Sequence, residues 1–160
     1  MKSFFRIFLL VLSVSLISCS GAAKFNQFYS QHKNDNNVKS FQVPRYLKSL
    51  VKNVSPELNN VFKNVSDFKT ISFTNSTPQQ DIQITEGINN ITQNYTDVIR
   101  NNNADKKTLV SVKEKGDFIK EVLIHTHENN NHKIIFLKGN FDPNKIKSLI
   151  DDHELEELNF

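Results

Sequence analysis

Three histidines in the last third of the chain are the best candidates for metal ligands in this sequence. His125 and His127 are two residues apart at the end of an apolar stretch, and His132 follows a run of three asparagines. Side chains two apart in a β-strand point to the same face, and a strand returning after a turn would bring His132 toward them. Three imidazoles suit zinc or copper, so the spacing predicts a metal site. The alternative is a group of ordinary surface histidines beside a polar hairpin end.

Other classes of active site find little support in the sequence. A single cysteine excludes a disulfide framework and a thiolate zinc cluster, because each needs at least two sulfur atoms. The four glycines are scattered, so the chain has no glycine-rich phosphate loop, and no G-x-S-x-G nucleophile motif occurs. We therefore expect no catalytic residue and no cofactor.

The cysteine lies at the end of an export signal. Lys2 and Arg6 precede an apolar run of eleven residues, 7–17. This length suits a signal peptide and is shorter than the roughly 20 residues of a membrane-spanning helix. The string LISC that ends at Cys19 resembles the bacterial lipobox. The resemblance implies that residues 1–18 are removed and that the Cys19 sulfur carries a diacylglycerol thioether. The alternative is an ordinary secretory peptide followed by an unmodified cysteine.

The net charge of the mature chain gives no support to a nucleic-acid partner. Lys2 and Arg6 are the charged residues of the export signal, so its removal lowers the formal net charge from +3 to +1. Nucleic-acid phosphates demand a clustered basic face, and this balance does not suggest one. No acidic run follows Cys19, which favours the periplasmic side of the membrane. We expect the partners to be the membrane, through the lipid, and an envelope protein, with no nucleic acid.

Helical and strand-like periods predict one α+β domain over residues 24–150, after a lipidated cysteine and tether at residues 19–23 and before an acidic, solvated tail at residues 151–160. Apolar residues at helical spacing predict helices at residues 25–29, 44–54, 56–65 and 84–99 and a last helix that starts at Pro143. Alternating residues predict strands at 38–43 and 70–74, and a three-stranded antiparallel meander at 109–113, 118–127 and 132–138.

Two strands of this meander are apolar on both faces, at residues 122–124 and 134–137. Continuous apolar runs indicate burial on both sides of a sheet. Either helices cover both faces, or one face meets another surface. The predicted fold is therefore an antiparallel sheet with a C-terminal three-stranded meander, packed by helices.

Three strings carry a family resemblance: residues 38–47 (VKSFQVPRYL), residues 120–124 (KEVLI), and residues 135–141 (IFLKGNF) followed by Ile146. They resemble the Bacteroidetes lipoproteins grouped as domain of unknown function 4252. In that family a strand runs into a helix near the start, and a late meander closes the domain. The acidic residue that follows the glycine in the family is Asn140 here. The resemblance covers nearly the whole mature chain and implies no activity, catalytic residue or ligand.

Three functional hypotheses follow. The leading one is a non-enzymatic envelope lipoprotein, tethered by Cys19, whose sheet or helical surface binds a protein or another envelope component. The second is a periplasmic metal-binding protein or enzyme that uses His125, His127 and His132. The third is a soluble secreted domain, which would carry no acyl chains.

Overall fold

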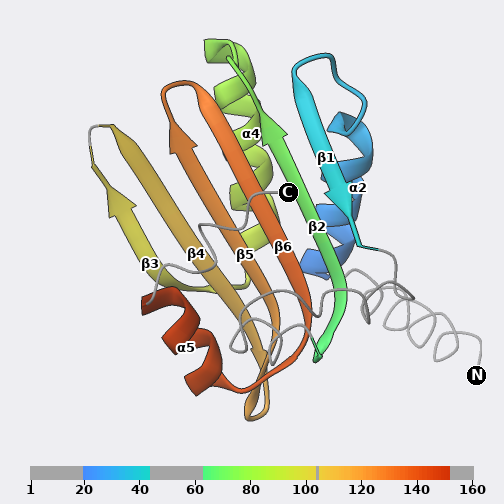
Figure 1. Cartoon of the computed structure of the whole chain (residues 1–160), viewed down its shortest axis with the longest axis vertical. Coiled ribbons are helices and arrows are strands. Elements are labelled where there is room, and N and C mark those ends of the chain that lie inside the picture. The colour runs from blue at the N-terminus through green and yellow to red at the C-terminus, as the bar shows by residue number, and fades with distance from the viewer. Residues whose placement is uncertain (1–19, 44–62, 104, 152–160) are drawn as a thin grey trace, which may run out of the picture.

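Six antiparallel strands form one sheet in the computed structural model, which describes residues 20–43, 63–103 and 105–151 (Figure 1). Their order across the sheet is β1-β2-β6-β5-β4-β3. The last four strands follow one another along the chain and pair in turn. This pairing confirms the predicted C-terminal meander and adds one strand before it. The strands are β1 (Val38–Gln42), β2 (Val65–Phe73), β3 (Thr96–Asn102), β4 (Lys106–Lys115), β5 (Phe118–Glu128) and β6 (Asn131–Phe141).

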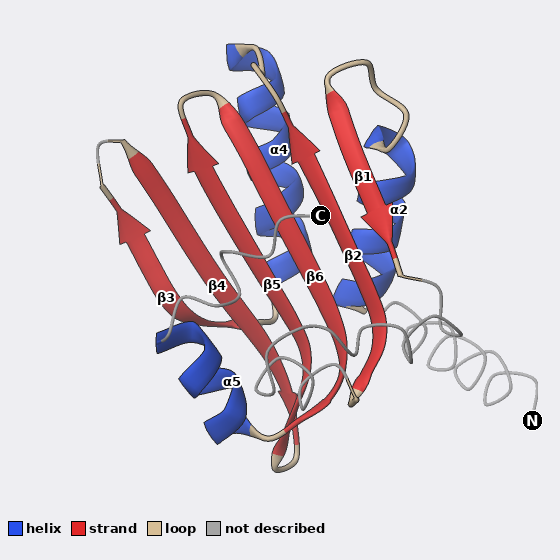
Figure 2. Ribbon diagram, in the orientation of Figure 1, coloured by secondary structure: helices blue, strands red, loops and turns tan. Residues whose placement is uncertain are grey.

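Helices pack against both faces of the sheet (Figure 2). On one face lie α2 (Gly21–His32) and α4 (Pro78–Thr92), whose buried side chains pack with Leu123 of β5. On the other face, α5 (Pro143–Asp151) packs beside Val122 of the same strand. No helix in the described part of the chain is long and apolar enough to cross a membrane. Neighbouring residues of one strand thus enter two separate cores, which confirms the predicted α+β fold with burial on both faces.

Helix α4 begins where its sequence favours a start. The Thr77 side chain accepts a hydrogen bond from the backbone N–H of Gln80, and the Gln80 side chain accepts one from the backbone N–H of Thr77. This reciprocal cap satisfies donors that the first turn leaves without partners, and Pro78 occupies the position where its fixed φ suits a helix. The buried face of the helix is a stripe at helical spacing, made of Ile84, Ile88 and Ile91.

Two predicted helix boundaries are wrong. Val98 and Ile99 continue the helical spacing of α4 but lie on β3, because the helix ends at Thr92. As an edge strand, β3 is exposed along most of its length, so it lacks the alternation by which a strand is recognised. Val65 likewise matches the stripe of a preceding helix, yet it opens β2 and is buried in the core beside Val122.

The predicted tether and tail also need correction where the structure describes them. Ser20 caps α2 through its side chain, and residues 21–23 form the first turn of this helix instead of a flexible tether. At the other end, Asp151 still belongs to α5. The export signal, Cys19, the helices predicted within residues 44–62 and the tail from residue 152 onward lie outside the described residues.

Gly139 on β6 supports a prediction about the close approach of two backbones. A Cβ atom at this position would overlap the carbonyl oxygen of Asn64 and the ring of Phe141. Because backbone cannot yield as a flexible side chain does, we expect Gly139→Ala to lower the free energy of unfolding by about 1–3 kcal/mol in urea denaturation. The control is Gly116→Asn, at a turn with φ of +62° and open space around it, where asparagine is tolerated. An unchanged midpoint for Gly139→Ala would contradict the packing described.

Candidate functional site

A tight turn sets the register of the two strands that carry the histidines. Asn129 and Asn130 connect β5 to β6 and have φ values of 48° and 61°. A two-residue hairpin turn with both residues in the left-handed region matches the twist of the strands it joins, and asparagine adopts this region more readily than most residues. The turn places His127 directly opposite His132.

The three histidine rings meet on the face that α2 and α4 cover. His127 and His132 lie nearly parallel, with 4.0 Å between ring centroids. Nε2 of His125 lies 2.9 Å from Nδ1 of His132, a hydrogen bond between imidazoles. His132 is buried, and the other two are half-buried. The structure therefore brings together all three histidines that the sequence singles out.

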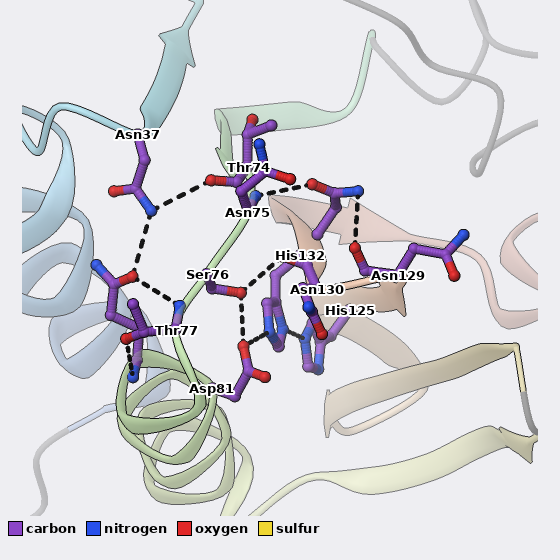
Figure 3. A network of polar contacts seen from close by, with 12 residues as sticks. Asn37, Thr74, Asn75, Ser76, Thr77, Asp81, His125, Asn129, Asn130 and His132 are labelled. Carbon is purple, nitrogen blue, oxygen red and sulfur yellow. Dashed lines mark hydrogen bonds and ion pairs between the residues drawn. The ribbon is translucent and has the colours of Figure 1, made fainter.

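Asp81 of α4 contacts one of these three histidines, His132. We call Asp81, His125, His127 and His132 together the histidine cluster. The loop before the helix is tied to the β5–β6 turn, since the backbone N–H of Ser76 donates to the Asn130 carbonyl at 2.8 Å. One helical turn later, Oδ1 of Asp81 lies 2.9 Å from Nε2 of His132 and 2.5 Å from the Ser76 hydroxyl. Figure 3 shows His132 between Asp81 and His125. The cluster thus links α4, β5 and β6 through a continuous chain of polar contacts.

Burial and hydrogen bonding set the charges within this chain. Burial raises the pKa of Asp81, but hydrogen bonds from Ser76 and His132 outweigh it, so the pKa of Asp81 lies below the ordinary value. Burial, followed by the neighbouring histidines, lowers the pKa of His125 to about 3. Burial also lowers the pKa of His132, and it outweighs the Asp81 hydrogen bond. At neutral pH the Asp81 carboxylate therefore lies beside the neutral imidazoles of His125 and His132.

These charges define the direction of each hydrogen bond. A carboxylate can only accept, so Nε2–H of His132 donates to Asp81. A neutral imidazole has one N–H, which leaves Nδ1 of His132 as an acceptor, and Nε2–H of His125 donates to it. Both ring nitrogens of His132 are thus occupied.

Ser76, Asp81 and His132 are the residue types of a catalytic triad, but their connectivity differs. In a triad the imidazole contacts the nucleophilic hydroxyl and removes its proton. Here the Ser76 hydroxyl contacts the Asp81 carboxylate and the Asn130 carbonyl, while His132 contacts Asp81 and His125. Because both ring nitrogens of His132 have other partners, His132 is not placed to take the proton of the Ser76 hydroxyl.

A pocket of about 560 Å³ opens beside the cluster, between α4 and strands β3, β4 and β5. Its volume lies within the range typical of small-molecule sites. Apolar, charged and uncharged polar side chains line it together with two of the histidines. The lining includes Ile82, Ile88 and Leu109, then Asp81, Glu86, Arg100 and Lys107, and also His125 and His127.

At the opposite end of β5, Glu121 fixes the start of α2. Its buried carboxylate accepts hydrogen bonds from the backbone N–H of Ala22 (3.1 Å) and from the Tyr95 hydroxyl. Burial and the Glu121 carboxylate raise the pKa of Tyr95 above its usual range, so the phenol stays protonated and donates. A Cβ atom on Gly21 would overlap the Tyr95 ring, so this contact requires glycine there.

The family model described as Domain of unknown function (DUF4252) matches residues 29–149. The chain belongs to this family. The match spans every strand of the sheet and all four residues of the cluster. No match was found among curated proteins or among solved structures. Membership of DUF4252 therefore identifies the domain and implies no activity.

The sequence of this DUF4252 domain does not single out Asp81 or Ser76 as site residues. The string Ser76-Thr77-Pro78 does indicate a helix start, and an acid in the first turn suits the positive end of the helix dipole. What the sequence lacks is the spatial link to His132, which lies 51 residues further along the chain. That link depends on the order of strands in the sheet. The lipidation candidate, Cys19, lies outside the described residues.

The depressed pKa of His125 predicts how the stability of the DUF4252 domain depends on pH. The ordinary histidine pKa is 6.5, and in the folded protein that of His125 is about 3. Between these values the unfolded chain binds a proton that the folded chain does not, so stability falls as the pH decreases from about 6.5 toward 3. We expect the Tm of the wild type to fall across this window.

The variant His125→Gln should show a shallower decline of Tm with pH, because it removes one of the groups responsible. The control is Gln83→Asn, which exchanges one uncharged, exposed side chain of α4 for another and should keep the wild-type slope. Equal slopes for wild type and His125→Gln would show that His125 titrates normally.

Proposed function

We propose that this DUF4252 protein is a bacterial envelope lipoprotein of the Bacteroidetes type, held at a membrane through a lipidated Cys19 and facing the periplasm. Its domain serves as a non-enzymatic binding or scaffolding module for an envelope component. The observation that carries the binding role is the pocket between α4 and the sheet. The lipobox-like string that ends at Cys19 supports the anchor.

The start of α2 fits this mode of attachment. Ser20 caps the helix and Gly21 begins it, so folded structure starts directly after the proposed lipid site. Glu121 and Tyr95 hold this end of α2 against the sheet. A lipid on Cys19 would therefore hold the domain close to the membrane surface, with no long linker between them.

The pocket suits a small ligand with an apolar body and a polar end. Ile82, Ile88 and Leu109 offer apolar surface. Charged groups of both signs line the same cavity, namely Arg100, Lys107, Asp81 and Glu86. Pockets that bind small molecules commonly combine an apolar lining with a few polar groups that fix orientation. The Ser76, Asp81 and His132 connectivity described above supports binding over covalent catalysis.

The anchor can be tested by replacing Cys19 with alanine in the native host. We expect mature-sized protein to leave the membrane fraction, because the thioether cannot form, and any uncleaved precursor is separated by size. Mass spectrometry of the wild-type protein should find acyl chains on the N-terminal peptide. The control variant is Ala23→Ser, on the exposed side of α2, which should stay membrane-bound. Unmodified sulfur on the processed wild-type chain would refute the anchor.

The pocket can be tested with the fluorescent probe 8-anilinonaphthalene-1-sulfonate, which combines an apolar body with one negative charge. Thr85 lines the pocket, and Gln83 is an exposed neighbour on α4 that does not. We expect Thr85→Phe to weaken probe binding about tenfold, or roughly 1.4 kcal/mol, because the added ring occupies the cavity. Gln83→Phe should bind the probe as the wild type does. Unchanged binding in Thr85→Phe, or equal losses in both variants, would count against the pocket as the binding site.

A further inference from the structure

Three metal-binding side chains converge beside the pocket from separate elements. Asp81 comes from α4, His127 from β5 and His132 from β6, and one potential ligand atom of each lies within 4.8 Å of the other two. Ligands of one tetrahedral zinc ion stand about 3.3 Å apart, given bonds of about 2.0 Å. An imidazole binds a metal in the plane of its ring, so the nearly parallel rings of His127 and His132 would have to tilt toward each other to share an ion.

We propose that Asp81, His127 and His132 bind one divalent transition-metal ion, of which zinc fits best, and that His125 is a positioning residue for His132. Two imidazoles and a carboxylate form a ligand set that zinc commonly takes. The set predicted from sequence changes in one respect, because Asp81 replaces His125 as a ligand. The inference goes beyond the proposed function, since it requires neither the lipid nor a pocket ligand.

The place of His125 follows from its hydrogen bond. If Nε2 of His132 binds the metal, its remaining proton must sit on Nδ1, which lies 2.9 Å from Nε2 of His125. Metal-bound histidines usually donate this second N–H to a neighbouring acceptor, which fixes the tautomer and the ring orientation. The His125–His132 hydrogen bond then reverses direction, and each ring keeps one proton. The proton on Nε2 of His132 leaves, that of His125 passes to Nδ1 of His132, and Nδ1 of His125 takes up one proton, so the net number of bound protons does not change.

The site would leave room for a further ligand. Asp81 and His127 also line the pocket between α4 and the sheet, so the metal would lie at the pocket wall. Three protein ligands leave the fourth position of a tetrahedral ion open. An ion at this place could therefore take a water molecule or an anionic group of a pocket ligand.

The test is a calorimetric titration of Zn²⁺ into the full chain in detergent. We expect one equivalent to bind at micromolar concentration or below. Asp81→Asn, His127→Gln and His132→Gln should each weaken binding by about 100-fold or more, since each removes a ligand. His125→Gln should retain binding and weaken it by roughly 10- to 100-fold, as other losses of a group behind a metal ligand do.

A matched control and a second readout keep the test independent of folding defects. His32 also lies 3.0 Å from an aspartate, Asp35, but among the described residues it has no second imidazole as a hydrogen-bond partner. His32→Gln should therefore bind Zn²⁺ as the wild type does. Zinc should raise the Tm of the wild type and of His32→Gln, but not that of Asp81→Asn. The Co²⁺-loaded protein should show a tetrahedral visible spectrum without thiolate bands.

Several results would overturn the proposal. These are the absence of heat at micromolar Zn²⁺, undiminished binding in Asp81→Asn or His127→Gln, or an equal loss of affinity in His32→Gln. Thiolate bands in the Co²⁺ spectrum would place the metal at Cys19 instead. A loss in His125→Gln as complete as that in His127→Gln would contradict the role given to His125.

Discussion

The register of the β5–β6 hairpin is the constraint on which the site depends. Side chains alternate between the two faces of a strand, so a slip of one residue would move every side chain of β5 or β6 to the other face. The left-handed conformations of Asn129 and Asn130 allow a turn of two residues and thereby fix the pairing. The same register that places His127 opposite His132 also sends Leu123 into one core and Val122 into the other.

A second constraint is the cost of burying polar groups, and it explains why α4 is tied to this hairpin. An unpaired polar atom in a core costs roughly 1–3 kcal/mol, and His132 is almost completely buried. Asp81 and His125 satisfy its two ring nitrogens, and Ser76 in turn contacts Asp81. Every buried side-chain nitrogen or oxygen within the described residues has a hydrogen-bond partner. Contacts that could prepare a metal site therefore also hold the helix against the sheet.

The sequence predicts those parts of this fold whose signals are local. The strands of the meander follow from continuous apolar runs, and α4 follows from its cap and its isoleucine stripe. The edge strand β3 escapes prediction because its residues are exposed on both faces, so burial does not shape their pattern. Residues 21–23 are small and look like a linker, yet they form the first turn of α2 behind the Ser20 cap. Glu121, 99 residues away from Ala22, accepts the N–H of that residue, and this contact has no local signal in the sequence. The group of three histidines is predicted because its spacing is local to one hairpin. Asp81 is not, since its place depends on the pairing of β2 with β6.

The two ends of β5 have separate roles in the proposed molecule. Glu121 holds the first turn of α2, next to the proposed lipid site, while His127 lies six residues further along the same strand. At about 3.3 Å per residue this separation is roughly 20 Å. In Figure 1, α2 accordingly starts at the end of the sheet opposite the β5–β6 turn and the start of α4. If Cys19 carries the lipid, the membrane lies at the α2 end, and the histidine cluster faces away from it. In the proposed lipoprotein, the length of β5 would then separate the histidine cluster from the lipid headgroups.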